Sequence, residues 1–537
     1  MIGSAWTPDK IGFVACYPNV ARAGMASLGM HVITRIAGEH PRFIADTCFM
    51  PEKPAGSRLA STRIGAPLAS FSLVGFSCPF EPDYPNVAWM LRAAGIPVTA
   101  AARTEARARG DQVPVVIAGG IAVSSNPLPV LPLFDFIFML DSELSFRRFL
   151  DDFPRFLEDD HASSASGIDA WWQSFGGSRL GIVPAFKYRA GEDVPWGIIF
   201  SPEACKVDQP GLDGAAAIID QALADPDDTD AALGTSFLLE IGRGCGEGCR
   251  FCLVGSRLRP PRIASDAAIA AQVVSIKDAR LPCKKIALIA TNVADHPGLA
   301  AACDCILDAG LQVSIPSTKP VSDARLLGMI KRSGIKTITI APETGSDTLR
   351  AAANKKVTTE KYESATVALL DAGVSTIKIY MLFGLPFETP GDLDRTIEFL
   401  ERLRDHVLGH GARLAVTINP FIPKLGTPFM FHVDNYLSEN IKAFKQRYGE
   451  FARRAEKAIR ARVDIMSIKE ARVQAVLSLG GIEIAQHVTR VPFAIPDDAA
   501  DRVLRGTRDM QLMAAFPAPL DRIVPVPLSF LKREWER

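Results

Sequence analysis

The 537-residue sequence has no excess of charge of either sign. Lysine and arginine together number 60, and so do aspartate and glutamate, which leaves a net charge near zero. Without a basic or acidic field, the chain has no general electrostatic attraction for nucleic acid or for an anionic membrane surface. We therefore expect a small-molecule or lipid substrate rather than a nucleic acid.

Long apolar runs are also missing. The most apolar stretch, Leu128 to Leu140, is interrupted by two prolines and an aspartate and is too short to span a bilayer. The N-terminus lacks the charged and then apolar pattern of a secretory signal. Ten cysteines are few for a chain of this length, and they fit a reducing compartment better than a disulfide framework. These absences predict a cytoplasmic protein without a transmembrane segment.

The composition is that of a folded α/β protein. Hydrophobic residues make up 48% of the sequence, which argues against disorder, and the length predicts roughly two to four domains. Short apolar runs alternate with helical segments in two parts of the chain, a pattern typical of parallel sheets covered by helices. The expected organisation is a Rossmann-like doubly wound sheet in residues 1–150, a connector in 151–234, a partial (β/α)6 barrel of the TIM type in 235–436, and a helical C-terminal extension in 437–537.

The apolar runs give the expected strands. Those of the first sheet are Ile11–Tyr17, Phe43–Phe49, Leu73–Ser77, Val115–Ala118 and Phe134–Leu140. Those of the barrel are Thr235–Ile241, Lys285–Ala290, Gln312–Pro316, Thr337–Ala341, Thr376–Leu382 and Leu414–Pro420. In both kinds of sheet, ligands and catalytic groups lie at the carboxyl ends of the strands.

Three cysteines lie close together on a glycine-rich stretch that directly follows the first barrel strand. Cys245, Cys249 and Cys252 have the spacing C-x3-C-x2-C. Thiolates on one flexible loop can converge on a soft metal centre, which selects iron–sulfur or zinc. A structural zinc site takes four protein ligands, and the next cysteine or histidine along the chain is Cys283. Three thiolates fit a [4Fe–4S] cluster that keeps one iron open for a small molecule.

The pattern C-x3-C-x-aromatic-C, with Phe251 before the last cysteine, resembles the signature of radical S-adenosylmethionine (SAM) enzymes. The resemblance implies that Cys245, Cys249 and Cys252 are the catalytic and metal-binding residues and that the open iron binds SAM. It also implies cleavage of SAM to methionine and a 5′-deoxyadenosyl radical. The electron would come from a reductant such as flavodoxin or ferredoxin.

Later phrases at the strand ends resemble the SAM pocket of the same family. Glu343, after the fourth barrel strand, could accept hydrogen bonds from SAM, and Gly384, after the fifth, would let the backbone approach the adenine closely. Ser314 and Lys378 are further candidates for cofactor binding, although either could be a buried polar group or a surface residue. Read alone, Glu343 could cap a helix and Gly384 could belong to a turn. Thr291-Asn292 departs from the glycine- and serine-rich turn expected after the second strand.

Residues 1–150 resemble the cobalamin-binding-like domain that precedes the barrel in one large subfamily. The resemblance implies that cobalamin could be a further cofactor and that a methyl group could be transferred to a substrate radical. The D-x-H-x-x-G motif, whose histidine binds cobalt in many cobalamin proteins, is absent, and His31 and His40 lie outside such a context. The phrases that carry the resemblance are Tyr17-Pro18-Asn19, Gly75-Phe76-Ser77, Ala94-Gly95-Ile96-Pro97, Ala118-Gly119-Gly120 and Asp141-Ser142-Glu143.

Two alternatives remain open beside this interpretation. Cys16, Cys48 and Cys78 lie at or just past the ends of expected strands. They are either small buried residues or ligands of a second cluster, as in the methylthiotransferases. The other alternative is a non-catalytic iron–sulfur protein that keeps the fold. The function we expect first is a radical SAM enzyme that modifies an unactivated carbon, with cobalamin-dependent methylation as the reaction.

Overall fold

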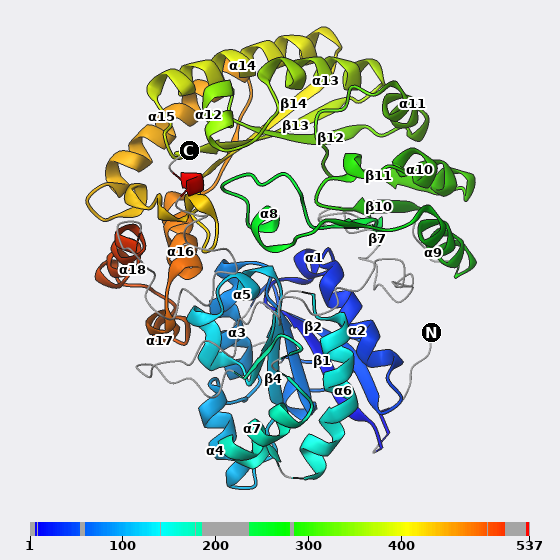
Figure 1. Ribbon diagram of the computed structural model, residues 1–537, viewed down its shortest axis with the longest axis vertical. Coiled ribbons are helices and arrows are strands. Elements are labelled where there is room, and N and C mark those ends of the chain that lie inside the picture. Colours follow the sequence, from blue (N-terminus) through cyan, green and yellow to red (C-terminus); the bar gives the residue numbers. More distant parts are fainter. Residues whose placement is uncertain are drawn as a thin grey trace.

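The computed structural model describes residues 6–7, 9–53, 59–139, 141–159, 161–177, 179–184, 236–279, 284–490, 492–510 and 533–535. They form two α/β units, which lie one above the other in Figure 1, with helices α16, α17 and α18 along one side. Within these ranges, every helix is too short or too polar to cross a membrane.

The N-terminal unit is built on a six-stranded sheet with the order β2-β1-β3-β4-β5-β6. Every neighbouring pair is parallel except β5 and β6. Its central strands are apolar along their whole length because helices cover both faces of the sheet. The strands are β1 (Ile11–Tyr17), β2 (Phe43–Phe49), β3 (Leu73–Ser77), β4 (Val115–Gly119), β5 (Phe136–Phe138) and β6 (Ile182–Pro184).

Helices pack on the two faces of this sheet. One face carries α2 (Leu28–Glu39) and α6 (Glu143–Glu158), whose apolar residues share a core with β1. The other carries α3 (Tyr84–Ala93) and α5 (Ile121–Ser125). The doubly wound arrangement expected from the alternating sequence pattern is therefore confirmed. It leaves the carboxyl ends of the parallel strands pointing toward the second unit (Figure 1).

The sheet extends beyond the boundary that we expected at residue 150. Helix α6 continues to Glu158, because Phe149, Phe153 and Phe156 fall on one buried face of it. Helix α7 (Ala165–Ser174) follows, and β6 then adds to the edge of the sheet beside β5. The first part of the expected connector thus belongs to the N-terminal unit.

The second unit is a partly open barrel. Its strands follow one another around an arc, with the connecting helices on the convex side (Figure 1). The ladder is continuous from β7 to β11 and again from β12 to β15 (Asp464–Ile465). Between the two pieces, the N–H of Thr318 donates to the carbonyl of Thr339 (3.0 Å). The six strands of the arc are β7 (Ser236–Glu240), β10 (Lys285–Ile289), β11 (Gln312–Ser314), β12 (Thr337–Glu343), β13 (Thr376–Phe383) and β14 (Arg413–Pro420).

Helices line the convex side in chain order, as expected for a (β/α)6 arrangement. Side chains along β13 alternate between buried and exposed, so its apolar residues pack under the helices while Lys378 and Tyr380 face inward. The ring of Tyr380 is 46% exposed. The helices are α9 (Asp266–Asp278), α10 (Leu299–Asp308), α11 (Ala324–Ser333), α13 (Thr359–Asp371) and α14 (Pro390–Gly409).

The expected helical extension is present. Helix α15 (Ile441–Ile459) packs beside α14 and places Phe444 and Phe451 against Phe383 of β13, with ring centres 5.5 and 5.4 Å away. Helix α16 (Ile468–Leu479), α17 (Ala485–Val488) and α18 (Asp497–Met510) complete it.

Buried polar contacts join the two units. The amide of Asn126 donates to the carbonyls of Ser478 (3.0 Å) and Gly480 (2.8 Å). Lys424, after β14, pairs with Glu81 of the N-terminal unit at 2.7 Å, and Gln474 of α16 donates to the same carboxylate. The carboxyl ends of both sets of strands are thereby held at the same seam.

Candidate active site

The three cysteines lie between β8 (Gly242–Arg243) and α8 (Leu253–Arg257), just past the carboxyl end of β7. The N–H of Cys245 donates to the carbonyl of Leu258 (3.2 Å), and that of Cys252 donates to Cys249 (3.0 Å). Gly244 has φ +83°, and any side chain there would collide with the Leu258 carbonyl. The loop therefore closes on itself in a shape that requires glycine before its first cysteine.

The thiols are half-buried and close enough to influence one another. Burial raises the pKa of Cys249 to about 11; Lys355 opposes the rise, and Cys252 and Cys245 add to it. Burial also raises the pKa of Cys252. Such thiols ionise readily only beside a strong positive charge, and a bound metal centre supplies it.

The three thiols of the cysteine loop fit a [4Fe–4S] cluster. In the part of the chain that the structure describes, no three cysteine, histidine or carboxylate side chains converge on a single ion. A [4Fe–4S] cluster does not require such convergence, because its thiolates bind different irons.

An ion pair lies beside the cysteines. Glu343 ends β12 with φ +66°, a conformation that residues other than glycine seldom adopt, and the strand register shifts just before it. The ammonium of Lys355 donates to Glu343 Oε1 (2.7 Å) and to the carbonyl of Ala341 (2.5 Å). It also lies 5.9 Å from the ring centre of Phe251. The structure thus brings together Phe251, Glu343 and Cys249 around a lysine.

Lys355 was not among the residues found from the sequence. It follows α12 (Asp347–Ala352) in an irregular loop, and its spacing to the cysteines gives no signal. Burial disfavours its charge, but Glu343 outweighs burial and raises its pKa above the ordinary value. A charged pair is therefore maintained at the carboxyl edge of the barrel.

The cysteine loop is tied to the end of α12 through Arg250. Its N–H donates to the carbonyl of Ala353 (3.0 Å), and its guanidinium donates to that of Ala352 (2.6 Å). Asn354 donates to the carbonyl of Gly248 (2.8 Å). These bonds connect the residues between the cysteines to the segment that carries Lys355.

Gly384 follows β13 with φ +78°, and a Cβ there would lie 2.7 Å from the ring of Phe444. Its N–H donates to both carboxylate oxygens of Glu388 (3.0 Å each). Backbone conformation and the Phe444 ring therefore explain the glycine; its contact with an adenine stays a prediction.

Gly384→Ala should destabilise the fold more than a matched glycine substitution. Gly310 has almost the same conformation, φ +79°, but nothing within 4 Å of its Cβ position. Gly310→Ala should cost about 1 kcal/mol for the left-handed backbone alone. Gly384→Ala should cost about 3 kcal/mol, since crowding of Phe444 adds to that strain. Urea unfolding of both variants measures the difference; equal costs would show that the Phe444 contact does not matter.

Glu388 should make stability depend on pH. Burial raises its pKa from 4.5 to about 7, against the opposing hydrogen bond from Gly384. Between these values the unfolded chain releases the proton and the folded chain keeps it. Stability from this group is therefore complete below pH 4.5 and is lost as pH rises to about 7. Glu388→Gln should remove this loss of about 3 kcal/mol. The midpoint of urea unfolding should then change less between pH 5 and 8 in the variant than in the wild type, and parallel profiles would contradict this.

The two weaker candidates lie on the barrel strands. Ser314 is the last residue of β11, beside Ala287 of β10, at the carboxyl edge. Lys378 lies further back on the inner face of β13, in register with Thr339 and Ala415. At the turn after β10, the side chain of Asn292 accepts a hydrogen bond from the N–H of Lys319 (3.2 Å).

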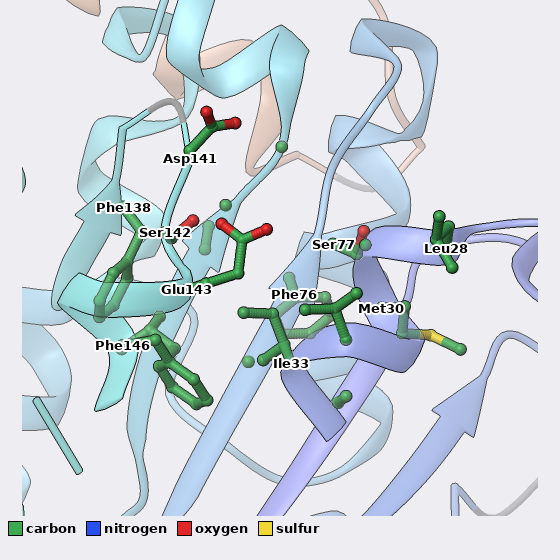
Figure 2. Close-up of a pocket in the computed structure, with 18 of the residues that line it drawn as sticks. Leu28, Met30, Ile33, Phe76, Ser77, Phe138, Asp141, Ser142, Glu143 and Phe146 are labelled. Atoms are coloured by element: carbon green, nitrogen blue, oxygen red, sulfur yellow. The ribbon is translucent and has the colours of Figure 1, made fainter. Parts of the chain in front are cut away.

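A second site lies in the N-terminal unit. A cavity of about 340 Å³ opens at the carboxyl ends of β1, β3 and β4, between α2 and α6. In Figure 2, Glu143 and Phe146 approach it from one side, and Ile33 and Phe76 from the other. Three of the phrases noted in the sequence meet here: Gly75-Phe76-Ser77, Ala118-Gly119-Gly120 and Asp141-Ser142-Glu143.

Residues at the carboxyl ends of the first barrel strands cover one side of this cavity. Arg243, two residues before the first cysteine, pairs with Asp141 (3.0 Å), Glu143 (2.7 Å) and Glu240 (2.7 Å). Leu258, whose carbonyl holds Cys245, also lines the cavity. The cavity therefore lies directly behind the cysteine loop, and an arginine offsets its acidic residues.

Neither histidine considered from the sequence lines the cavity. The ring of His31 bonds the carbonyl of Met25 (2.9 Å), and His40 lies 3.4 Å from Asp151. Cys16 and Cys48 are register partners on β1 and β2, and both are buried. Because the preceding residue of β1, Ala15, lines the cavity, Cys16 faces the other side of the sheet.

Two family models match the chain. Residues 29–165 match the N-terminal domain of radical SAM proteins, and residues 239–400 match the radical SAM superfamily. The chain belongs to the radical SAM superfamily. Membership implies a [4Fe–4S] cluster and SAM as cofactors and supports its assignment as an enzyme.

Individual relatives are distant. The uncharacterized protein MJ0966 of Methanocaldococcus jannaschii is 29% identical over 272 residues, which are 50% of this chain and 58% of that protein. The solved structure of the cobalamin-dependent radical SAM enzyme OxsB is 14% identical and covers 73% of this chain and 52% of its own, with a TM-score of 0.45. Coproporphyrinogen III oxidase (HemN) from Escherichia coli is 13% identical over 41% of this chain and 52% of its own, with a TM-score of 0.30. The chain thus spans little more than half the length of the relatives it matches.

Proposed function

We propose that Cys245, Cys249 and Cys252 hold a [4Fe–4S] cluster and that this radical SAM enzyme acts on an unactivated carbon. The observation that carries the proposal is the meeting of three half-buried thiols with a strained glutamate and a lysine at the carboxyl edge of an open barrel. When bound, a cluster of this kind supplies one electron to SAM, which is thereby cleaved to methionine and a 5′-deoxyadenosyl radical.

The chain's own residues would bind and orient the cofactor. Glu343 would offer its carboxylate to the amino or hydroxyl groups of SAM, and Lys355 holds that carboxylate in place. Phe251 presents a ring next to the lysine. Ser314 and Lys378 are proposed as further contacts on the inner face of the strands. A small molecule or a lipid chain would bind along the inner face of the strands, where Tyr380 is exposed.

Anaerobic reconstitution tests this proposal. We expect about four irons per chain, and 5′-deoxyadenosine should form when dithionite, flavodoxin or ferredoxin supplies the electron. Zinc in the purified protein, or no 5′-deoxyadenosine from the loaded protein, would refute the proposal. About eight irons per chain would instead indicate a second cluster on Cys16, Cys48 and Cys78.

We further propose cobalamin-dependent methylation as the reaction. The support is the cavity behind the cysteine loop. It has apolar walls, and Gly75 and Gly119 lie at its edge, so its shape suits the flat aromatic base of cobalamin. The described residues that line it include no histidine, so this cavity would provide no nitrogen ligand to cobalt. Hydroxocobalamin binding, followed by corrinoid absorbance after desalting, tests the proposal. A protein that retains no corrinoid would remove this reaction and leave the SAM chemistry in place.

A further inference from the structure

The end of the chain returns to the cysteine loop. Residues 533–535 are helical, and Figure 1 shows this C-terminal piece beside the loop that leads into α8. Glu534 Oε2 accepts hydrogen bonds from Nε (3.4 Å) and Nη2 (3.2 Å) of Arg250. The two side chains are only 13% and 9% exposed. Arg250 lies between Cys249 and Phe251 in the sequence, so the carboxylate holds the loop at its centre.

Trp535, the next residue, packs against the segments that follow the carboxyl ends of two barrel strands. Its ring centre lies 5.5 Å from that of Phe387, after β13, and 5.9 Å from that of Phe429, in the short helix η10 (Pro428–Phe431) after β14. Phe429 also donates its N–H to the carbonyl of Arg250 (3.1 Å). Phe251 packs in the same apolar cluster. The chain end therefore contacts both the cysteine loop and the strand ends that face it.

Backbone strain at this place points to a ligand site. Phe387 has φ +68°, which is rare for a bulky residue, and its ring is 54% exposed. Glu343 has the same kind of conformation at the end of the adjacent strand. Strained residues of this kind cluster at functional sites, where the surrounding structure maintains them. Here Trp535 is one of the groups that contact the strained ring.

We propose that Glu534 and Trp535 are positioning residues of the cofactor site. Glu534 fixes Arg250, and with it the loop segment between Cys249 and Cys252. Trp535 covers the side of the site next to Phe387 and Phe429, and its ring thereby shields bound SAM from water. This inference rests on the proposed function, since the ligands concerned are the cluster and SAM.

Three variants and a matched control test the proposal. Glu534→Gln weakens the bond to Arg250, Trp535→Ala removes the ring, and a chain ending at Lys532 lacks both. Glu439→Gln is the control, because Glu439 pairs with Arg505 at 2.8 Å on the surface of the C-terminal extension. In the metal-free protein, hydrogen exchange of the peptide that spans residues 245–258 should quicken about tenfold in the three variants. The control should match the wild type.

The loaded enzyme provides the second readout. The KM for SAM should rise about tenfold in Glu534→Gln and Trp535→Ala, with a smaller change in kcat, and Trp535→Phe should restore most of the affinity. A lower urea midpoint with normal loop exchange and normal KM would show that the chain end only anchors the fold and would overturn the inference. Failure of the wild type to bind a cluster would refute the proposed function, whereas the exchange measurement on metal-free protein would still decide the positioning role.

Discussion

Cys249→Ala should yield a folded protein without its cluster. The thiol is half-buried on a loop, so its loss leaves the barrel core intact, while one iron loses its protein ligand. Iron content should fall from about four per chain to less than about one. Formation of 5′-deoxyadenosine should fall by a factor on the order of 1000 or more, as expected when a group that acts as part of a unit is removed. Iron analysis and product chromatography on anaerobic samples measure both quantities.

Cys305→Ala is the matched control. Cys305 lies on α10 of the same barrel, away from the cysteine loop. The variant should retain the iron and the activity of the wild type. If Cys249→Ala also retained them, the three loop cysteines would not be the ligands, and another set of residues would have to be sought.

Glu343→Gln should have the second largest effect. The substitution removes the charge that would hold SAM and leaves Lys355, whose side chain is 19% exposed, without its counter-ion. Hydrogen bonds to charged groups contribute about 1.5–3 kcal/mol, so the KM for SAM should rise by roughly ten- to a hundredfold. Stability should fall by about 1–3 kcal/mol because an unpaired ammonium is left partly buried.

A double substitution separates these two effects. Lys355→Met combined with Glu343→Gln should recover most of the stability, since no unpaired charge remains, but not the affinity for SAM. Glu363→Gln is the control; it breaks a 2.8 Å pair with Arg402 on the outer helices and should change neither quantity appreciably. An unaltered KM in Glu343→Gln would exclude this carboxylate from the SAM pocket.

The sequence predicted the buried strands well because each is a continuous apolar run bounded by turn residues. Ile11–Tyr17, Phe43–Phe49 and Leu73–Ser77 have the expected bounds in the structure. Phe134–Leu140 is shorter than expected, because the preceding 3-10 helix runs to Leu133 and the strand covers only Phe136–Phe138. Helix α6 crosses the expected boundary at residue 150, because its buried aromatic face continues to Phe156.

The cysteine loop could be found from the sequence because its spacing is local. Lys355 and Glu534 could not, since each reaches the site through a contact between distant parts of the chain. Arg250 and Glu534 are 284 residues apart. Gly384 was found from its place after the fifth barrel strand, and the structure adds that the ring of Phe444 occupies the space beside it.

The seam between the two units has a consequence for how substrates reach the centre. Parting the units would leave Asn126, Glu81 and Lys424 without their partners, each at a cost of about 1–3 kcal/mol. Opening a hinge between the two units is therefore disfavoured. Reactants would then approach along the inner face of the barrel strands, where Tyr380 is exposed, rather than through a gap opened between the two units.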